Sequence, residues 1–143
     1  MYLLVSFDIY SKDLSLAEIT AALGVEPTLS CSHERGSPRG SRHIWDITVW
    51  RCNSSKERDE DVSLEENVQE LIDKLCSRWS QASRQSLANC EAFLNVAFFI
   101  GIQFPDSTEE PVATSTLPAS QLEALGKAGV KLDITTYVTI VPE

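Results

Sequence analysis

The chain has 143 residues, a mass of 15.9 kDa and a formal net charge of −9, with 43% hydrophobic and 23% charged residues. This is the size and composition of an ordinary globular domain, so we expect residues 1–143 to form a single domain. The negative charge argues against nucleic acid or an anionic membrane as a partner, and it favours a basic protein. No stretch approaches the roughly 18 apolar residues of a membrane span.

The N-terminus and the cysteines indicate the compartment. Residues 1–10 contain no basic segment and no small-residue cleavage pattern, and Asp8 interrupts their apolar character. The chain has four cysteines, and none of them belongs to a C-x-x-C pair. We therefore expect a cytoplasmic protein with reduced thiols.

The first elements are a strand, a helix and a second strand. Residues 2–10 alternate in polarity, which predicts a strand with one strongly apolar face. Ser15 and Glu18 form a capping-box pattern, so a helix begins here and ends at Gly24. After a loop over residues 28–42, the alternation in HIWDITVWR predicts a second strand over residues 43–51.

The second helix has the clearest periodicity. Ser63 and Glu66 repeat the capping-box pattern, and apolar residues follow at helical spacing as far as Trp79. Residues 80–90 fit either a continued helix or a looser turn.

The C-terminal part predicts two further strands around a helix. AFLNVAFFIGIQF alternates as a long strand over residues 92–104, and residues 112–117 fit a short strand. Pro118 suits the start of a helix that ends at Gly129, and residues 131–140 form the last strand. We expect four of its residues to point inward: Leu132, Ile134, Val138 and Ile140.

The order of elements, β-α-β-α-β-(β)-α-β, predicts the fold class. Parallel strands covered on both faces would form continuous apolar runs, whereas each strand here has one face that is much more apolar than the other. We therefore predict an α+β two-layer sandwich, a mainly antiparallel sheet with helices packed on one face, as a ferredoxin-like variant. The open face would expose more aromatic surface than a monomer usually does, so we expect a partner, a homodimer mate or cover from the long loops there. Its residues would be Tyr2, Leu4, Tyr10, Trp50, Phe99 and Tyr137.

Several short stretches resemble a bacterial domain family of unknown function. They are LGVEP after the first helix, RG in the loop, W-D-I at 45–47, SLEENVQELIDKL and the closing LDITTY. The resemblance spans nearly the whole chain and implies a single α+β domain. It carries over no catalytic residue, because none is established for the family.

HERGSPRGSRHIW, residues 33–45, is the basic segment of this acidic chain. Guanidinium groups beside flexible backbone bind phosphate or carboxylate, so the segment is a candidate anion site. It lacks the G-K-[ST] of a phosphate loop, and its Cys and His spacing matches no common zinc site. The candidate contacts are His33, Arg35, Arg39, Arg42 and His43.

The sequence gives little support for catalysis. It has no nucleophile elbow, and its two histidines both flank the basic loop. Asp8, Asp46 and Asp133 would form an acid–base site only if the fold gathered them. We therefore expect no catalytic residue, metal or cofactor.

The remaining hypothesis is a binding protein. Residues 57–66 carry six acidic residues against one arginine, a local charge of −5, which suits either a solvated loop or a basic partner. We expect a non-catalytic protein-binding module, of which an immunity protein that neutralises a toxin is one form. The alternative is a small ligand-binding or enzymatic domain centred on residues 31–45. The expected partner contacts are Tyr10, Trp50, Phe99, Tyr137, Asp59, Glu60 and Asp61.

Overall fold

The computed structural model describes residues 2–55, 63–104 and 116–142. Within these ranges, the main sheet has four strands in the order β4-β1-β5-β6. They are β1 (Tyr2–Ser11), β4 (Thr48–Asn53), β5 (Glu91–Phe104) and β6 (Lys131–Pro142). β1 is antiparallel to both of its neighbours, β4 and β5, whereas β5 and β6 are parallel. The sheet is therefore mixed, with β1 running opposite to the other three strands.

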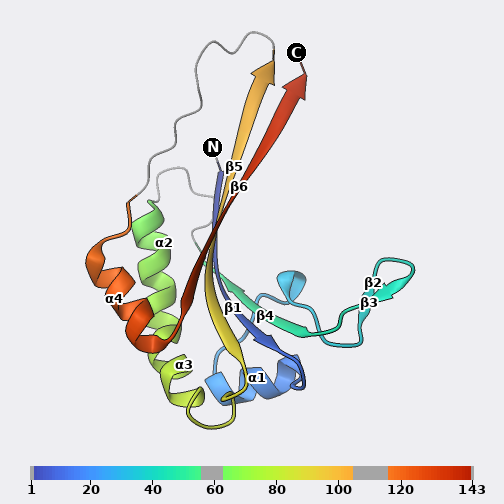
Figure 1. Ribbon diagram of the computed structural model, residues 1–143, viewed down its shortest axis with the longest axis vertical. Coiled ribbons are helices and arrows are strands. Elements are labelled where there is room, and N and C mark those ends of the chain that lie inside the picture. The colour runs from blue at the N-terminus through green and yellow to red at the C-terminus, as the bar shows by residue number, and fades with distance from the viewer. Residues whose placement is uncertain (1, 56–62, 105–115, 143) are drawn as a thin grey trace.

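The α-helices of the described residues lie on one face of this sheet (Figure 1). They are α1 (Leu16–Leu23), α2 (Leu64–Leu71), α3 (Ser77–Ala82) and α4 (Ala119–Ala128), and the π-helical turn η2 (Ile72–Cys76) joins α2 to α3. The predicted α+β two-layer sandwich is confirmed. No helix in the described ranges is long and apolar enough to cross a membrane.

The helix boundaries follow the capping patterns of the sequence. Ser15 and Glu18 form the complete capping box of α1, and the Ser63 side chain accepts a hydrogen bond from the Glu66 main chain. Gly24 and Gly129 end α1 and α4 in the left-handed conformation, with φ of 70° and 72°. Residues 80–90, which fitted two interpretations, are helical to Ala82 and then form turns.

The core lies between the sheet and the helices. Val5, Phe7 and Ile9 of β1 are fully buried, and the register places Leu94 of β5 beside Phe7. Since alternate strand residues point to opposite faces, Leu4, Ser6, Asp8 and Tyr10 of β1 lie on the open face. The largest fully buried side chains of the cluster also include Trp50, Ile19, Leu71, Leu75 and Leu87.

The predicted strand over residues 43–51 is wrong in its extent. β3 (His43–Ile44) pairs with β2 (Pro38–Arg39) in a separate hairpin that projects beyond β4, and β4 begins only at Thr48 (Figure 1). Trp50 lies opposite Ile9 on the helix face and is fully buried. The expectation that Trp50 lies on the open face is therefore wrong. The residues of β4 that face the helices are Trp50 and Cys52, and the predicted alternation that began at Trp45 does not extend into β4.

The burial predicted for the last strand is also wrong. Ile134 and Val138 are each 56% exposed, Ile140 is 66% exposed and Leu132 is 37% exposed. They share the helix side of the sheet. Val138 and Ile140 belong to the part of β5 and β6 that extends past β1 and the helices (Figure 1). Leu132 and Ile134 pair with the buried Leu94 and Val96, but they lie on the edge strand and remain partly exposed. Of the short strand expected over 112–117, residues 112–115 lie outside the described residues, and Thr116 and Leu117 belong to no strand.

Candidate functional site

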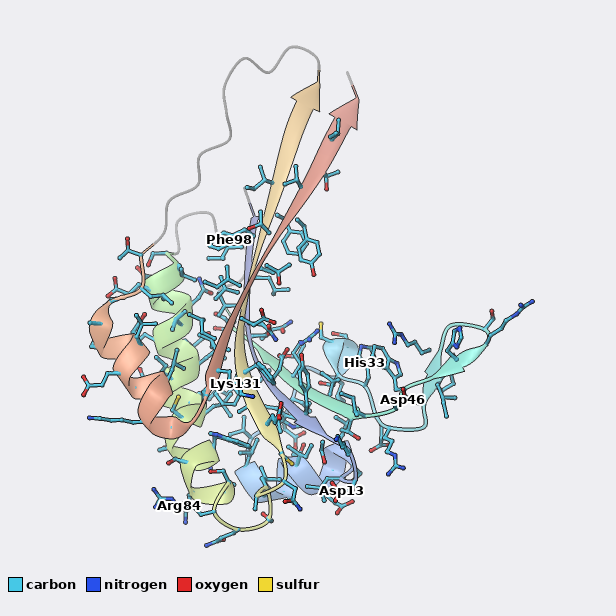
Figure 2. The ribbon with its side chains drawn as sticks, in the orientation of Figure 1. Asp13, His33, Asp46, Arg84, Phe98 and Lys131 are labelled. Atoms are coloured by element: carbon cyan, nitrogen blue, oxygen red, sulfur yellow. The ribbon has the colours of Figure 1, made fainter. Side chains whose placement is uncertain are left out.

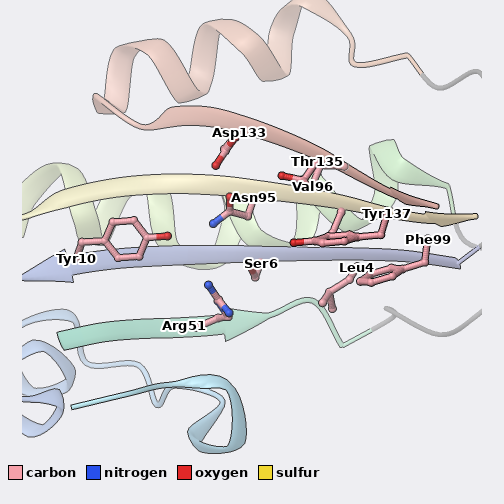
Figure 3. A pocket seen from close by; sticks show the side chains of 11 residues that line it. Leu4, Ser6, Tyr10, Arg51, Asn95, Val96, Phe99, Asp133, Thr135 and Tyr137 are labelled. Atoms are coloured by element: carbon pink, nitrogen blue, oxygen red, sulfur yellow. The ribbon is translucent and has the colours of Figure 1, made fainter. Parts of the chain in front are cut away.

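The open face of the main sheet contains a hollow of about 410 Å³ (Figure 3), which we call the sheet groove. All four strands of the sheet contribute to it, because alternation turns every second residue to this face. Its lining combines three aromatic residues with polar ones. These residues are Tyr10, Phe99 and Tyr137, with Ser6, Arg51, Asn95, Asp133 and Thr135.

A buried ion pair anchors the polar side of the sheet groove. Asp8 is 0% exposed and lies opposite Arg51 in the β1–β4 register. Arg51 donates from Nε to Asp8 Oδ1 at 2.9 Å and from Nη2 to Oδ2 at 2.8 Å, and Asn95 donates from Nδ2 to the same Oδ2. Burial lowers the pKa of Arg51, but the hydrogen bond and charge of Asp8 outweigh it and leave this pKa raised. The guanidinium therefore stays charged.

Aromatic rings form a second part of the sheet groove, beside the aliphatic Leu4, Val96 and Ala97. Phe99 and Tyr137 lie opposite each other in the β5–β6 register, and their rings stack with centroids 4.9 Å apart at 11°. Tyr10 packs against Phe93, with centroids 5.0 Å apart. The hydroxyl groups of Tyr10 and Tyr137 point toward each other from opposite ends of the groove (Figure 3). The rings therefore leave polar tips facing the central space.

The charge of the sheet groove is negative. Arg51 is neutralised by Asp8, whereas Asp133 has no ion-pair partner among the described residues. Asp133 lies beside Asn95 in the β5–β6 register and points toward the groove (Figure 3). A groove that combines an unpaired carboxylate with aromatic rings favours a ligand that carries a cationic group.

The basic loop forms a separate cluster around Trp45. The His33 ring stacks on Trp45 with centroids 4.1 Å apart, and Arg39 Cζ lies 4.7 Å from the Trp45 centroid. His43 is exposed and lies opposite Arg39 in the hairpin. The structure thus brings three of the five candidate anion contacts together, and Trp45 accounts for the positions of His33 and Arg39.

Two other candidate contacts of this loop do not join the cluster through any recorded contact. The main-chain N of Arg35 donates to Thr48 Oγ1 at 3.1 Å, and the Arg35 side chain is exposed. Arg42 is exposed in the turn of the hairpin.

The structure gathers only part of the predicted partner surface. Tyr10, Phe99 and Tyr137 line the sheet groove, whereas Trp50 lies in the core, where its Nε1 donates to Thr20 Oγ1 at 3.1 Å. The predicted contacts Asp59, Glu60 and Asp61 lie outside the described residues.

The predicted carboxylates do not form a shared acid–base site. Asp8 is paired with Arg51, and Asp46 is exposed between the hairpin and β4, on the same side as His33 (Figure 2). Within the described residues, no group of three or more His, Cys, Asp and Glu side chains is arranged to hold a metal ion.

Sequence reasoning missed Arg51, Asn95 and Thr135 as lining residues. A signal for the first was present, because Asp8 and Arg51 are opposite charges inside otherwise apolar strands. Charges in such positions are retained only when they are paired. Asn95 and Thr135 carried no comparable signal, since single polar residues on an open face are common.

The fold and the sheet groove together define a two-layer α+β domain with an open, partly aromatic sheet face. Residues 1–139 match the family model described as Domain of unknown function (DUF4279), and the chain belongs to this family. The predicted membership of a family of unknown function is therefore confirmed. Neither the curated proteins nor the solved structures provide a match to the chain.

Proposed function

We propose that this protein is a non-catalytic binding module that holds a basic segment of a protein partner in the sheet groove. The observation that carries the proposal is the combination of the stacked Phe99 and Tyr137 rings with the Asp133 carboxylate, which has no ion-pair partner among the described residues. The formal net charge of −9 supports a basic partner, because long-range attraction speeds the encounter of opposite charges.

A lysine or arginine side chain of the partner fits this lining. Its cation would pair with Asp133, and its aliphatic part would lie along the ring of Tyr137. Arg51 uses Nε and Nη2 for Asp8, so Nη1 remains as a donor for a partner carbonyl group. The sheet groove therefore offers both an acceptor and a donor to one extended segment.

The polar groups of the sheet groove support a binding role rather than catalysis. Both oxygens of Asp8 accept hydrogen bonds from Arg51 or Asn95, so this carboxylate is committed to structure. No histidine is among the groove-lining residues that the structure describes. Neutralising a basic toxin, as an immunity protein does, is the particular form of this role that the acidic composition supports.

The test is a titration of the ¹⁵N-labelled protein with short lysine- and arginine-containing peptides, observed by amide chemical shifts. We expect shifts at residues of β5 and β6 around Asn95 and Asp133, and their loss in Asp133→Asn and Tyr137→Ala. Arg39→Ala, in the hairpin, is the matched control and should bind normally. Absent shifts, or equal shifts with glutamate-containing peptides, would contradict the proposal.

The immunity role has its own test. A protein captured from the native host through the sheet groove should arrest growth when expressed alone, and co-expression of this chain should restore growth. Asp133→Asn should abolish the rescue and Arg39→Ala should preserve it. A captured protein that leaves growth unaffected would refute the immunity role without touching the binding role.

The stack of His33, Trp45 and Arg39 favours a second candidate, an anion site on residues 31–45. The free edge of the Arg39 guanidinium and the nearby His43 would contact a phosphate or carboxylate ligand. Inorganic phosphate and citrate should then raise the melting temperature of the wild type but not of Arg39→Ala. Unchanged melting temperatures would exclude this candidate.

A further inference from the structure

β6 forms one edge of the main sheet. Among the described residues it pairs only with β5, which leaves the other side of its backbone without a strand partner over residues 131–142. Such an edge presents a row of main-chain donors and acceptors, and natural proteins usually protect it with charges, prolines or bulges. In β6, charges occur only near the start, at Lys131 and Asp133, and the one proline is the last residue, Pro142, so residues 134–141 carry neither.

The side chains of β6 make the edge apolar. Ile134, Val138 and Ile140 are 56%, 56% and 66% exposed, and Leu132 is 37% exposed. Figure 2 shows that the upper parts of β5 and β6 carry side chains with no helix beside them. An apolar edge of this length is more stable when another strand covers it than when it is exposed to water.

We propose that a second copy of this chain covers the edge, through antiparallel pairing of β6 with β6 about a two-fold axis at Thr136. The polarity of β6 is symmetric about this residue. In this register Leu132 lies opposite Ile140 of the second copy, and Ile134 lies opposite Val138. On the open face, Thr135 lies opposite Tyr137 of the second copy. Every apolar position of the helix side thus meets an apolar position, as a symmetric interface requires.

The charges of the edge permit this pairing. Asp133 lies opposite the uncharged Thr139, and the two symmetry-related Asp133 carboxylates are roughly 20 Å apart at about 3.4 Å per residue. That separation exceeds the screening length of roughly 8 Å at physiological salt. No like charges oppose each other between Leu132 and Ile140.

The exposed side chains of the helix side add to the backbone pairing. Leu132, Ile134, Val138 and Ile140 are between 37% and 66% exposed, and in the proposed register each lies directly opposite an aliphatic residue of the second copy. Apolar pairs of this kind between neighbouring strands stabilise a sheet, in addition to the main-chain hydrogen bonds of the new strand pair.

The pairing extends the sheet without changing its layers. Opposed residues of antiparallel strands share a face, so both helix layers lie on one side of a continuous eight-stranded sheet. Both sheet grooves lie on the other side, and Tyr137 of the second copy lies next to Thr135 at the border of each groove. Dimerisation requires no ligand in either groove, because the main-chain groups and the helix-side residues of β6 form the interface.

Sedimentation equilibrium of the full chain tests the dimer. We expect twice the 15.9 kDa mass of one chain at submillimolar concentration. Ile134→Lys should weaken dimerisation roughly 100-fold, because the substitution occurs twice in a symmetric interface. The matched control is Ile44→Lys, since Ile44 is 62% exposed on the hairpin beyond the opposite edge of the sheet. It should leave the dimer intact, and circular dichroism should show that both variants are folded.

The register has a separate test. Adding Val138→Glu to Ile134→Lys places opposite charges across the proposed interface, so the double variant should recover at least tenfold of the lost affinity. Within one copy these two positions are four residues apart along the strand, too far to pair. A monomeric wild type would overturn the proposal, as would a dimer that Ile134→Lys does not weaken. Failure of the double variant to recover would overturn the Thr136-centred register.

Discussion

Replacing Arg51 by methionine should destabilise the fold through the carboxylate that it leaves behind. Asp8 is fully buried, and Arg51 supplies two of the three hydrogen bonds that its oxygens accept. Methionine preserves much of the aliphatic packing of the arginine but removes the charge. Among the described residues, Asn95 then remains as the single side-chain donor to this buried carboxylate.

The cost follows from the burial of the two partners. Breaking a buried ion pair costs about 3–5 kcal/mol when the remaining charge is inaccessible to water. Because the Arg51 side chain is 31% exposed, its removal admits some water to Asp8, and we expect about 2–3 kcal/mol for Arg51→Met. Asp8→Asn should cost only about 1–2 kcal/mol, since the remaining guanidinium reaches solvent.

Urea unfolding followed by tryptophan fluorescence measures these values, because Trp50 and Trp79 are both buried. In Asp8→Asn with Arg51→Met no buried charge remains, so the double variant should be at least about 1 kcal/mol more stable than the sum of the single changes predicts. Arg84→Met, on an exposed arginine, is the control and should change stability by less than about 0.5 kcal/mol. Additive effects of the two changes would refute the assignment of Asp8 and Arg51 as a coupled buried pair.

Three further predictions concern the core, a helix cap and a thiol. Trp50→Ala should cost about 3–5 kcal/mol in urea unfolding, and a cost below about 1 kcal/mol would place Trp50 at the surface. Ser15→Ala should cost about 1 kcal/mol by the same assay, and Glu18→Gln should cost less because its amide oxygen can still accept from the Ser15 main chain. Burial, with a smaller effect of Asp73, raises the pKa of Cys76 to about 11 from an ordinary 9.0. The unfolded thiol therefore ionises first, and stability should fall by roughly 2–3 kcal/mol between about pH 9 and pH 11. Cys76→Ala should remove this part of the pH dependence, and an unchanged profile would contradict it.

The helix boundaries and the layer arrangement could be predicted because they depend on local chemistry. Ser15, Ser63, Gly24 and Gly129 determine where helices start or end through hydrogen bonds and φ angles that involve only neighbouring residues. The single apolar face of each strand likewise indicates a sheet covered on one side. These features require no knowledge of which strands pair.

The position of Trp50 and the exposure of β6 could not be predicted, because both depend on contacts between distant parts of the chain. Trp50 and Val49 are both apolar, so the alternation in β4 does not say which of them faces the helices. That choice depends on the pairing of Trp50 with Ile9, a contact between distant parts of the chain. The exposure of Ile140 depends on how far the helices extend along β6, which its own alternation does not contain.

The sequence predicts the sheet groove through its large apolar residues, which include Leu4 beside the aromatic ones. Tyr10, Phe99 and Tyr137 were recognised because large rings on an open face need an explanation. Arg51 and Asp8 lie 43 positions apart in sequence and meet only through the antiparallel register of β1 and β4. Their pairing changes the charge of the groove, since it leaves Asp133 as the uncompensated group.

β6 connects the two proposals through the period of a strand. Its residues Asp133, Thr135 and Tyr137 face the sheet groove, whereas Ile134 and Val138 point to the helix side, where they would lie opposite Val138 and Ile134 of the second copy. A shift of β6 by one residue against β5 would exchange these two sets and destroy both surfaces together. The stacking of Tyr137 on Phe99 opposes such a shift, because it requires these two residues to stay opposite each other. The same aromatic pair therefore lines the binding groove and holds the register on which the proposed dimer depends.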